Sequence, residues 1–149
     1  MVEQVPFPSS VADLCLLERV SYRDAFIAKT TEIRTAEEWM RLALGSAPRG
    51  LLTGVRAVQT LLGLALAPAS PGRPLGWEIL RNDPDIFVLG ADGPGGSARL
   101  VGVVGDGQLV FTTQAAFGLR TRLIWAFAQF PHRAIARYLI GKALRASSR

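Results

Sequence analysis

The chain has 149 residues, a length typical of one globular domain, and carries 17 basic against 12 acidic residues, for a net charge of +5. Hydrophobic residues make up 49% and charged residues only 19%, but no apolar run reaches the roughly 18 residues of a membrane span. One cysteine and one histidine exclude an internal disulfide and a Cys/His zinc cluster, so we predict no metal and no cofactor. Glu3 and two prolines lie within residues 1–7, where a signal peptide has basic and then apolar residues, and we expect a cytoplasmic protein.

The first half of the chain predicts an arm, a strand and two helices. Residues 1–20 form the arm, with a short helical piece after Ser9-Ser10 and Cys15 as a small buried residue. Residues 22–30 alternate as a strand. The capping box at 35–38 starts a helix that ends near Gly45. A second helix, which we expect to end before Pro68, has apolar residues at helical spacing: Leu51, Val55, Val58, Leu62 and Leu66.

The second half predicts an antiparallel meander followed by a long helix. From residue 75 the apolar period is two, which indicates strands at 75–79, 86–91, 98–104 and 109–117. The Asp106-Gly107 pair is a hairpin turn signal. An amphipathic helix follows over 119–146, with Pro131 expected to bend it.

These elements predict the α+β class: an antiparallel sheet wrapped around a long C-terminal helix, with two short helices after the first strand. We expect a single domain over residues 21–146, with residues 147–149 as a tail. Such an arrangement leaves a hollow between sheet and helix. Four small residues lie in strands otherwise rich in large ones and would leave volume there if they face inward: Gly90, Gly102, Ala115 and Ala116.

Positive charge is concentrated at the C-terminal end. The last 43 residues hold seven basic and no acidic residues, whereas residues 1–106 hold ten basic and twelve acidic, a sum of −2. Because the long helix offers no carboxylate at i+3 or i+4, we expect some of its arginines to pair with Asp24, Asp83 or Asp85, and the rest to face water or an anionic partner.

Several short segments resemble the START and polyketide-cyclase-like (SRPBCC, helix-grip) superfamily, and more closely a small bacterial family of unknown function near it. The segments are 22–26 (YRDAF), 38–39 (EW), 75–77 (LGW), 85–89 (DIFVL), 123–125 (LIW) and 130–133 (FPHR). The resemblance implies a shortened helix-grip fold and a hydrophobic cavity, between sheet and C-terminal helix, that receives a small molecule.

Two ionisable residues are candidates for catalysis. Asp24 shares a strand face with Tyr22 and Phe26, and a carboxylate desolvated by aromatic rings could act as an acid or base. It could equally be solvated at the start of its strand or bonded to an arginine of the last helix. His132 follows Pro131 and could move protons at neutral pH, or lie exposed among arginines.

Other residues are candidates for ligand contact. Arg99 either holds an anionic ligand group or faces water, and Thr113 competes with Thr112 and Gln114 because it lies on the other strand face. The three tryptophans come from different elements and could meet in one place or simply fill the core. The full predicted set is Tyr22, Phe26, Trp39, Trp77, Arg99, Thr112, Gln114 and Trp125.

The leading functional hypothesis is binding of an apolar or amphipathic small molecule in this cavity. The alternative is a cyclase, dehydratase or isomerase in which Asp24 or His132 moves a proton and Arg99 steadies oxyanion charge. A third possibility is contact of the basic helix with an anionic membrane surface. No nucleic-acid-reading motif is present in the sequence, and we predict no nucleic-acid partner.

Overall fold

The computed structural model describes residues 2–15, 17, 20–45 and 47–147; the predicted burial of Cys15 and the last two residues of the tail lie outside what it describes. The elements in chain order are β1 (Val2–Val5), α1 (Ser9–Cys15), β2 (Tyr22–Lys29), α2 (Ala36–Gly45), α3 (Arg49–Leu61), the 3-10 turn η1 (Pro74–Gly76), β3 (Glu78–Asn82), β4 (Ile86–Gly93), β5 (Gly96–Gly105), β6 (Gln108–Phe117) and α4 (Leu119–Ser147).

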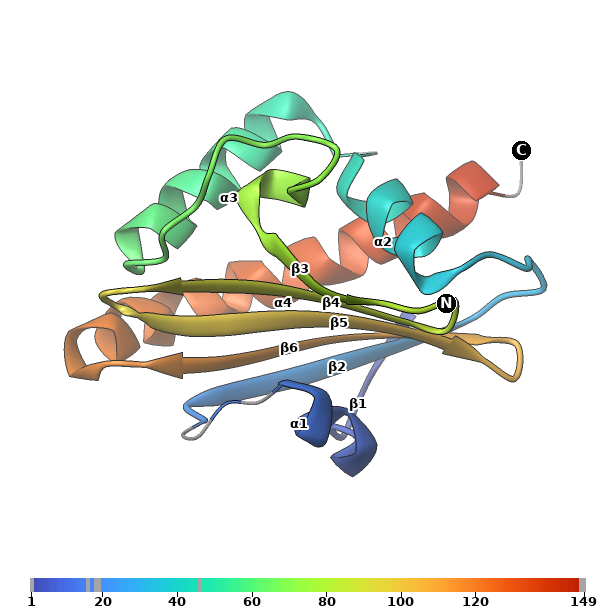
Figure 1. Cartoon of the computed structure of the whole chain (residues 1–149), viewed down its shortest axis with the longest axis horizontal. Coiled ribbons are helices and arrows are strands. Elements are labelled where there is room, and N and C mark those ends of the chain that lie inside the picture. Colours follow the sequence, from blue (N-terminus) through green and yellow to red (C-terminus); the bar gives the residue numbers. More distant parts are fainter. Residues whose placement is uncertain (1, 16, 18–19, 46, 148–149) are drawn as a thin grey trace.

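The six strands form one antiparallel sheet in the order β1-β2-β6-β5-β4-β3. Helices α2, α3 and α4 lie on one face of this sheet, and α1 lies on the other (Figure 1). The predicted α+β class, with a sheet around a long C-terminal helix and two short helices after the strand at 22–29, is confirmed. α4 continues through Pro131 as one helix.

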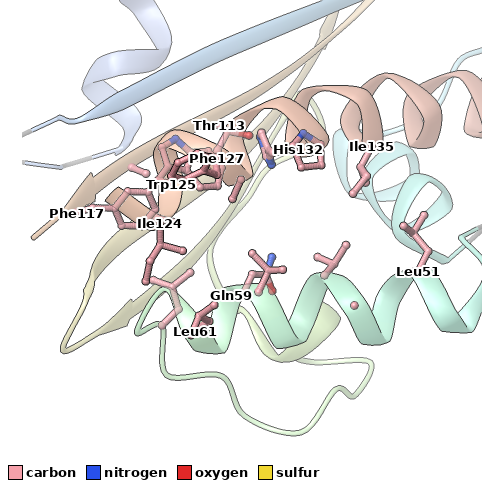
Figure 2. A pocket seen from close by; sticks show the side chains of 18 of the residues that line it. Leu51, Gln59, Leu61, Thr113, Phe117, Ile124, Trp125, Phe127, His132 and Ile135 are labelled. Atoms are coloured by element: carbon pink, nitrogen blue, oxygen red, sulfur yellow. The ribbon is translucent and has the colours of Figure 1, made fainter. Parts of the chain in front are cut away.

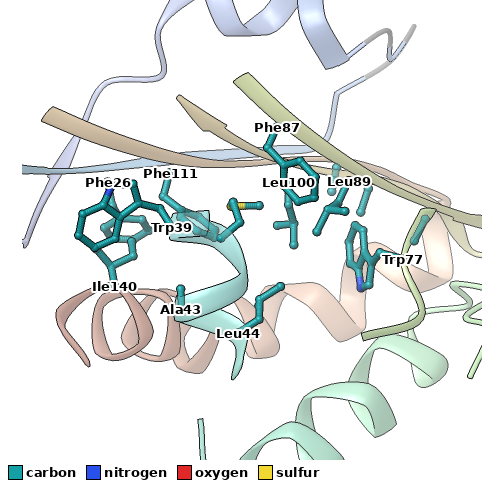
Figure 3. Close-up of a cluster of buried hydrophobic side chains, with 14 of the residues drawn as sticks. Phe26, Trp39, Ala43, Leu44, Trp77, Phe87, Leu89, Leu100, Phe111 and Ile140 are labelled. Atoms are coloured by element: carbon teal, nitrogen blue, oxygen red, sulfur yellow. The ribbon is translucent and has the colours of Figure 1, made fainter. Parts of the chain in front are cut away.

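The main core lies between the sheet and the helices α2 and α4. Trp39 and Met40 of α2 and Ile140 of α4 are almost fully buried against large side chains of the strands, as Figure 3 shows for Phe26 and Phe111. A second, smaller core lies on the opposite face, where Val11 of α1 covers valines of β4 and β5. Both faces of the central strands are therefore buried.

The N-terminal segment contributes more than an arm. β1 pairs antiparallel with β2, from Val2 opposite Ala28 to Val5 opposite Ala25, and α1 follows the predicted Ser9-Ser10 start. The sequence prediction missed β1. Its four residues are too few to show a period, and the strand owes its place to pairing with the edge of β2.

The capping box is confirmed, because the Thr35 amide donates to the Glu38 carboxylate at 2.7 Å and the Glu38 amide donates to the Thr35 hydroxyl at 3.2 Å. The predicted end of the second helix is wrong. α3 stops at Leu61, and Gly63 follows with a φ of +80°, a conformation that suits glycine and ends the helix.

The predicted start of the third strand is also wrong. Residues 74–76 form the turn η1, in which Leu75 and Gly76 have φ values of 51° and 83°, so β3 begins only at Glu78. The apolar alternation that begins at Leu75 therefore starts in a turn and not in a strand, and this turn brings Trp77 into the core.

Candidate functional site

A pocket of about 630 Å³ lies between α3 and α4, with the sheet as its floor (Figure 2). Three of its lining residues carry hydrogen-bonding groups at their tips: Gln59, Thr113 and His132. The other lining residues are glycine or predominantly apolar, and they are Gly50, Leu51, Gly54, Val55, Val58, Leu61, Leu64, Trp77, Ala98, Ala115, Phe117, Ile124, Trp125, Phe127, Ala128, Pro131 and Ile135. This volume is within the usual range for pockets that enclose a small organic molecule.

Helix α3 forms one wall of the pocket without packing into the core. None of its residues is buried, although Leu51, Val55 and Val58 form an apolar stripe at helical spacing that faces the pocket. An amphipathic helix normally gains its stability by burying such a stripe. In this protein the stripe faces open space instead.

The C-terminal end of α3 is tied to the turn between β4 and β5. The Ala65 amide donates to the Asp92 carbonyl at 2.9 Å, and the Gly95 amide donates to the Gly63 carbonyl at 3.2 Å. A Cβ atom on Gly63 would lie only 2.5 Å from Gly95, so this close approach requires glycine. The Gly118 amide, directly before α4, donates to the Gly95 carbonyl at 3.0 Å, so this end of α3 is linked through Gly95 to the start of α4.

A polar network joins the sheet to α4 behind one pocket wall. The Asp24 side chain is fully buried, and its Oδ2 accepts a 2.6 Å hydrogen bond from the Tyr22 hydroxyl and lies 3.0 Å from His132 Nε2. The His132 contact has the length of an ion pair without hydrogen-bond alignment, and it becomes a charged pair when the imidazole is protonated. Arg133 Nε completes the network by donating to the Tyr22 oxygen at 2.9 Å.

The rings of this network stack into the pocket wall. Tyr22 meets Trp125 edge-to-face with centroids 4.8 Å apart, and Trp125 lies 5.1 Å from the His132 ring. Burial and the hydrogen bond to Asp24 raise the pKa of the Tyr22 hydroxyl well above its usual value, even though Arg133 acts in the opposite direction. Tyr22 therefore stays neutral and orients the carboxylate.

The structure brings several of the predicted residues together. Trp77, Trp125 and His132 line the pocket, and Asp24 and Tyr22 lie directly behind His132 and Trp125. Thr113, the competitor of Thr112, faces the pocket as well. The aromatic and ionisable candidates of β2 and α4 are thus neighbours although they are about 100 residues apart in the sequence.

Three predicted ligand contacts are wrong, because their side chains lie on the opposite face of the sheet. These three residues are Arg99, Thr112 and Gln114. Arg99 lies opposite Gln114 in the sheet, and Thr112 lies opposite Val101, on the face that α1 partly covers. Arg99 binds Asp92 at 2.9 Å. Burial alone would raise the pKa of Asp92, but hydrogen bonds from Ser97 and Arg99 outweigh it and lower that pKa.

Two aromatic candidates belong to the core instead of the pocket. Phe26 and Trp39 are about 1% exposed and pack with Ile140 near the far end of α4 (Figure 3). The three tryptophans therefore do not meet in one site. Trp39 fills the core, and only Trp77 and Trp125 line the pocket.

The small residues explain the hollow only in part. Ala115 and Ala98 face the pocket. Gly102 lies on the same face, but Met40 fills its space, since a Cβ there would stand 2.8 Å from Met40 Cγ. Gly90 and Ala116 lie on the other face of the sheet, where Leu80 covers Gly90. The expectation that these two residues contribute to the hollow is therefore wrong.

Two of the carboxylates expected to pair with arginines of α4 have other direct partners, and those of Asp24 include His132 of α4 itself. Asp83 pairs with Arg81 of β3, and Arg133 reaches Asp24 only through the Tyr22 hydroxyl. Among the described residues, no group of three or more histidine, cysteine or carboxylate side chains is arranged to hold a metal ion. Within the same residues, no helix combines the length and the hydrophobicity that a bilayer crossing requires.

Sequence reasoning missed the role of α3 in the site. The signal was present, because Leu51, Val55 and Val58 share one helical face, but no contact with the ligand was predicted for that face. Gly50 and Gly54 on α3 leave further room, with no atom within 4 Å of a Cβ built on either. Two exposed glycines inside a short helix are the sequence feature that could have indicated an open wall.

No protein-family model and no curated protein sequence matches the chain. Its structure is similar to the crystal structure of protein Ms6760 from Mycobacterium smegmatis, with 16% identity, a TM-score of 0.42, and coverage of 88% of this chain and 98% of that one. It is also similar to the solution NMR structure of a protein from Arthrobacter aurescens, with 12% identity, a TM-score of 0.42, and coverage of 85% and 91%. Likeness at this level carries no argument about function.

Proposed function

We propose that the protein binds an apolar or amphipathic small molecule in the pocket between α3, α4 and the sheet. The observation that carries this proposal is the apolar stripe of α3, which faces about 630 Å³ of open space lined mainly by carbon. Unfilled apolar space of this size forfeits packing energy. A ligand that fills it would restore those contacts and bury the stripe.

The resemblance of the sequence to the helix-grip superfamily supports the same proposal. That resemblance implies a cavity between a sheet and a C-terminal helix, and α4 and the sheet form two of the three walls here. Fold analogy alone does not define a function, so the lining chemistry has to define the ligand class.

The lining favours a ligand with a largely apolar body and one polar group. Hydrogen-bonding side chains contribute at three points: Gln59 on α3, Thr113 on the sheet and His132 on α4. Gln59 already accepts a 3.4 Å hydrogen bond from the Trp77 indole. Its amide nitrogen, the Thr113 hydroxyl and the His132 ring are the groups suited to orient a hydroxyl, carbonyl or carboxylate.

The test is a binding titration with a homologous series of straight-chain alcohols against lipid-stripped protein. Each added CH₂ should improve affinity by about fourfold, or ~0.8 kcal/mol, until the pocket is full. Longer chains should then gain nothing. Affinity that is unmeasurable for every chain length, or that rises without a plateau as in non-specific adsorption, contradicts the proposal.

A second function is favoured by one observation, the contact of the buried Asp24 with His132. We propose as the alternative that this pair moves a proton on a bound ligand, in a reaction of the cyclase, dehydratase or isomerase type. The His132 ring borders the pocket and its Nε2 lies 3.0 Å from Asp24 Oδ2, so the pair is placed next to a bound ligand. Asp24 Oδ1 is buried and accepts no hydrogen bond from the described residues.

The two functions separate in the variants D24N and H132Q. If the pair is catalytic, both variants should lose turnover of a compound that the protein converts, by about a hundredfold or more, and should bind it nearly as before. If ligand binding is the whole function, no pocket ligand should be converted by the natural protein. Turnover that both variants retain would remove the pair from the mechanism.

A further inference from the structure

An exposed apolar stripe runs along the first half of α4. It consists of Leu119, Leu123, Phe127 and Phe130, whose exposed fractions are 81%, 69%, 82% and 64%. Their spacing of four, four and three residues places them on one side of the helix, opposite Trp125, which is buried toward the sheet. We call these four residues the outer stripe. Monomeric soluble proteins rarely leave such a row of large apolar side chains in water.

The charged residues of α4 beside the outer stripe are all positive. Arg120 and Arg122 are exposed within its first two turns, and Arg137 is exposed six residues after Pro131. No acidic residue occurs anywhere in the sequence after Asp106. Large apolar side chains flanked by arginines alone are typical of helices that lie in the surface of an anionic bilayer.

The outer stripe is continuous with the mouth of the pocket. Phe127 belongs to the stripe and also lines the pocket, and Leu61 at the end of α3 lines it from the other side while 65% exposed. Figure 2 shows Leu61 and Ile124 at the same end of the pocket, close to Phe127. An apolar molecule could therefore pass from a membrane into the pocket without crossing water.

We infer that the first half of α4 docks onto anionic membrane surfaces through the outer stripe and its arginines, with the pocket mouth held at the lipid. Docking itself does not depend on the function proposed above, whereas ligand exchange with the membrane rests on it. A second copy of this chain is the competing occupant of the stripe. It is less suited to the role, because a two-fold contact through this face would bring the arginines of both copies together.

The test is co-sedimentation of the full chain with phosphatidylcholine vesicles that contain or lack phosphatidylserine, over a series of salt concentrations. Docking predicts binding to the anionic vesicles only, with weakening as salt rises. L119S and L123S should each lower vesicle affinity by about tenfold, since each removes one large side chain from the lipid. R120Q should lower it by about fivefold.

Matched controls are available among other exposed residues. I33S changes the fully exposed Ile33, which lies in the loop between β2 and α2, and K29Q removes an exposed charge from β2. Both should bind vesicles like the natural chain. Neither Leu119 nor Leu123 lines the pocket, so their variants should bind a soluble ligand unchanged, and a failure of ligand binding is thereby distinguished from a failure of docking.

Three results would overturn the inference. The first is no binding to anionic vesicles at low salt. The second is equal loss of binding in I33S and L123S. The third is a dimer, measured by light scattering without vesicles, that L123S dissociates, because the stripe would then be an interface between two copies.

Discussion

Gly54 offers the most specific perturbation of the pocket, because it can be enlarged without a clash. It lies inside α3, lines the pocket, and has no atom within 4 Å of the position that a Cβ would take. We compare G54A with G54L. Both remove a helix-interior glycine, which should stabilise the fold by about 0.8–1 kcal/mol, but only leucine extends into the pocket.

The expected loss of affinity follows from the volume that leucine takes from the ligand. The leucine side chain brings four carbon atoms, where alanine brings one, so about three ligand CH₂ groups are displaced. At ~0.8 kcal/mol for each, G54L should bind a pocket-filling ligand ~2.4 kcal/mol more weakly than G54A, or about 60-fold. Thermal unfolding should show that both variants are at least as stable as the natural chain.

The assay is a fluorescence titration with a polyene fatty acid, read by energy transfer from tryptophan. Trp77 and Trp125 line the pocket and should dominate the signal, while Trp39 lies apart in the core. W39F therefore serves as a background control. Equal affinity of G54L and G54A would refute the reasoning, since the probe would then bind elsewhere.

Three further predictions concern stability. T35A should lower the free energy of unfolding, measured by urea denaturation, by about 1 kcal/mol, because the Thr35 hydroxyl accepts a hydrogen bond from the Glu38 amide at the start of α2. An unchanged urea midpoint would show that the cap contributes nothing to stability. G102A should destabilise the fold by about 1–3 kcal/mol, since its Cβ would press on Met40, and a stability gain like that of G54A would contradict the packing of that site. The raised pKa of Tyr22 means that its contribution to stability is complete below about pH 10 and is lost as the pH rises further; tyrosinate absorbance at high pH should show Tyr22 ionising only as the protein unfolds, and Y22F should lose that alkaline sensitivity.

The elements that the sequence predicted well are those whose signals are local. A capping box such as that of Thr35 and Glu38, or a turn such as Asp106-Gly107, requires only neighbouring residues, and the structure confirms both. Alternation in β2 likewise placed Tyr22 and Asp24 correctly on one face.

The assignment of the inner sheet face could not be made from alternation. Arg99 has Val101 and Val103 as facemates, and these valines are covered by α1 and its neighbours on the outer face. Because both faces of β5 bury apolar residues, its sequence contains no polar side to identify. Gly90 looked like a source of inner volume, whereas it makes room for Leu80 and Arg99 on the outer face.

The polar network also depends on tertiary structure. Arg133 and Tyr22 are 111 residues apart, and their hydrogen bond exists only because α4 lies across β2. One alternative considered from the sequence was a bond between Asp24 and an arginine of the last helix. In the structure the Tyr22 hydroxyl lies between Asp24 and Arg133 and is hydrogen-bonded to both. The intervening hydroxyl could not be foreseen from spacing.

The central claim is that the space between α3 and α4 holds an apolar molecule, and a crystal structure of protein purified from cells tests it most directly. The account predicts continuous density along the stripe of Leu51, Val55 and Val58, ending near His132. It also predicts that α3 keeps its distance from α4 through the Gly63–Gly95 contact. A structure in which α3 packs its apolar stripe directly against Ile135 and Trp125, with no space between them, would contradict the claim.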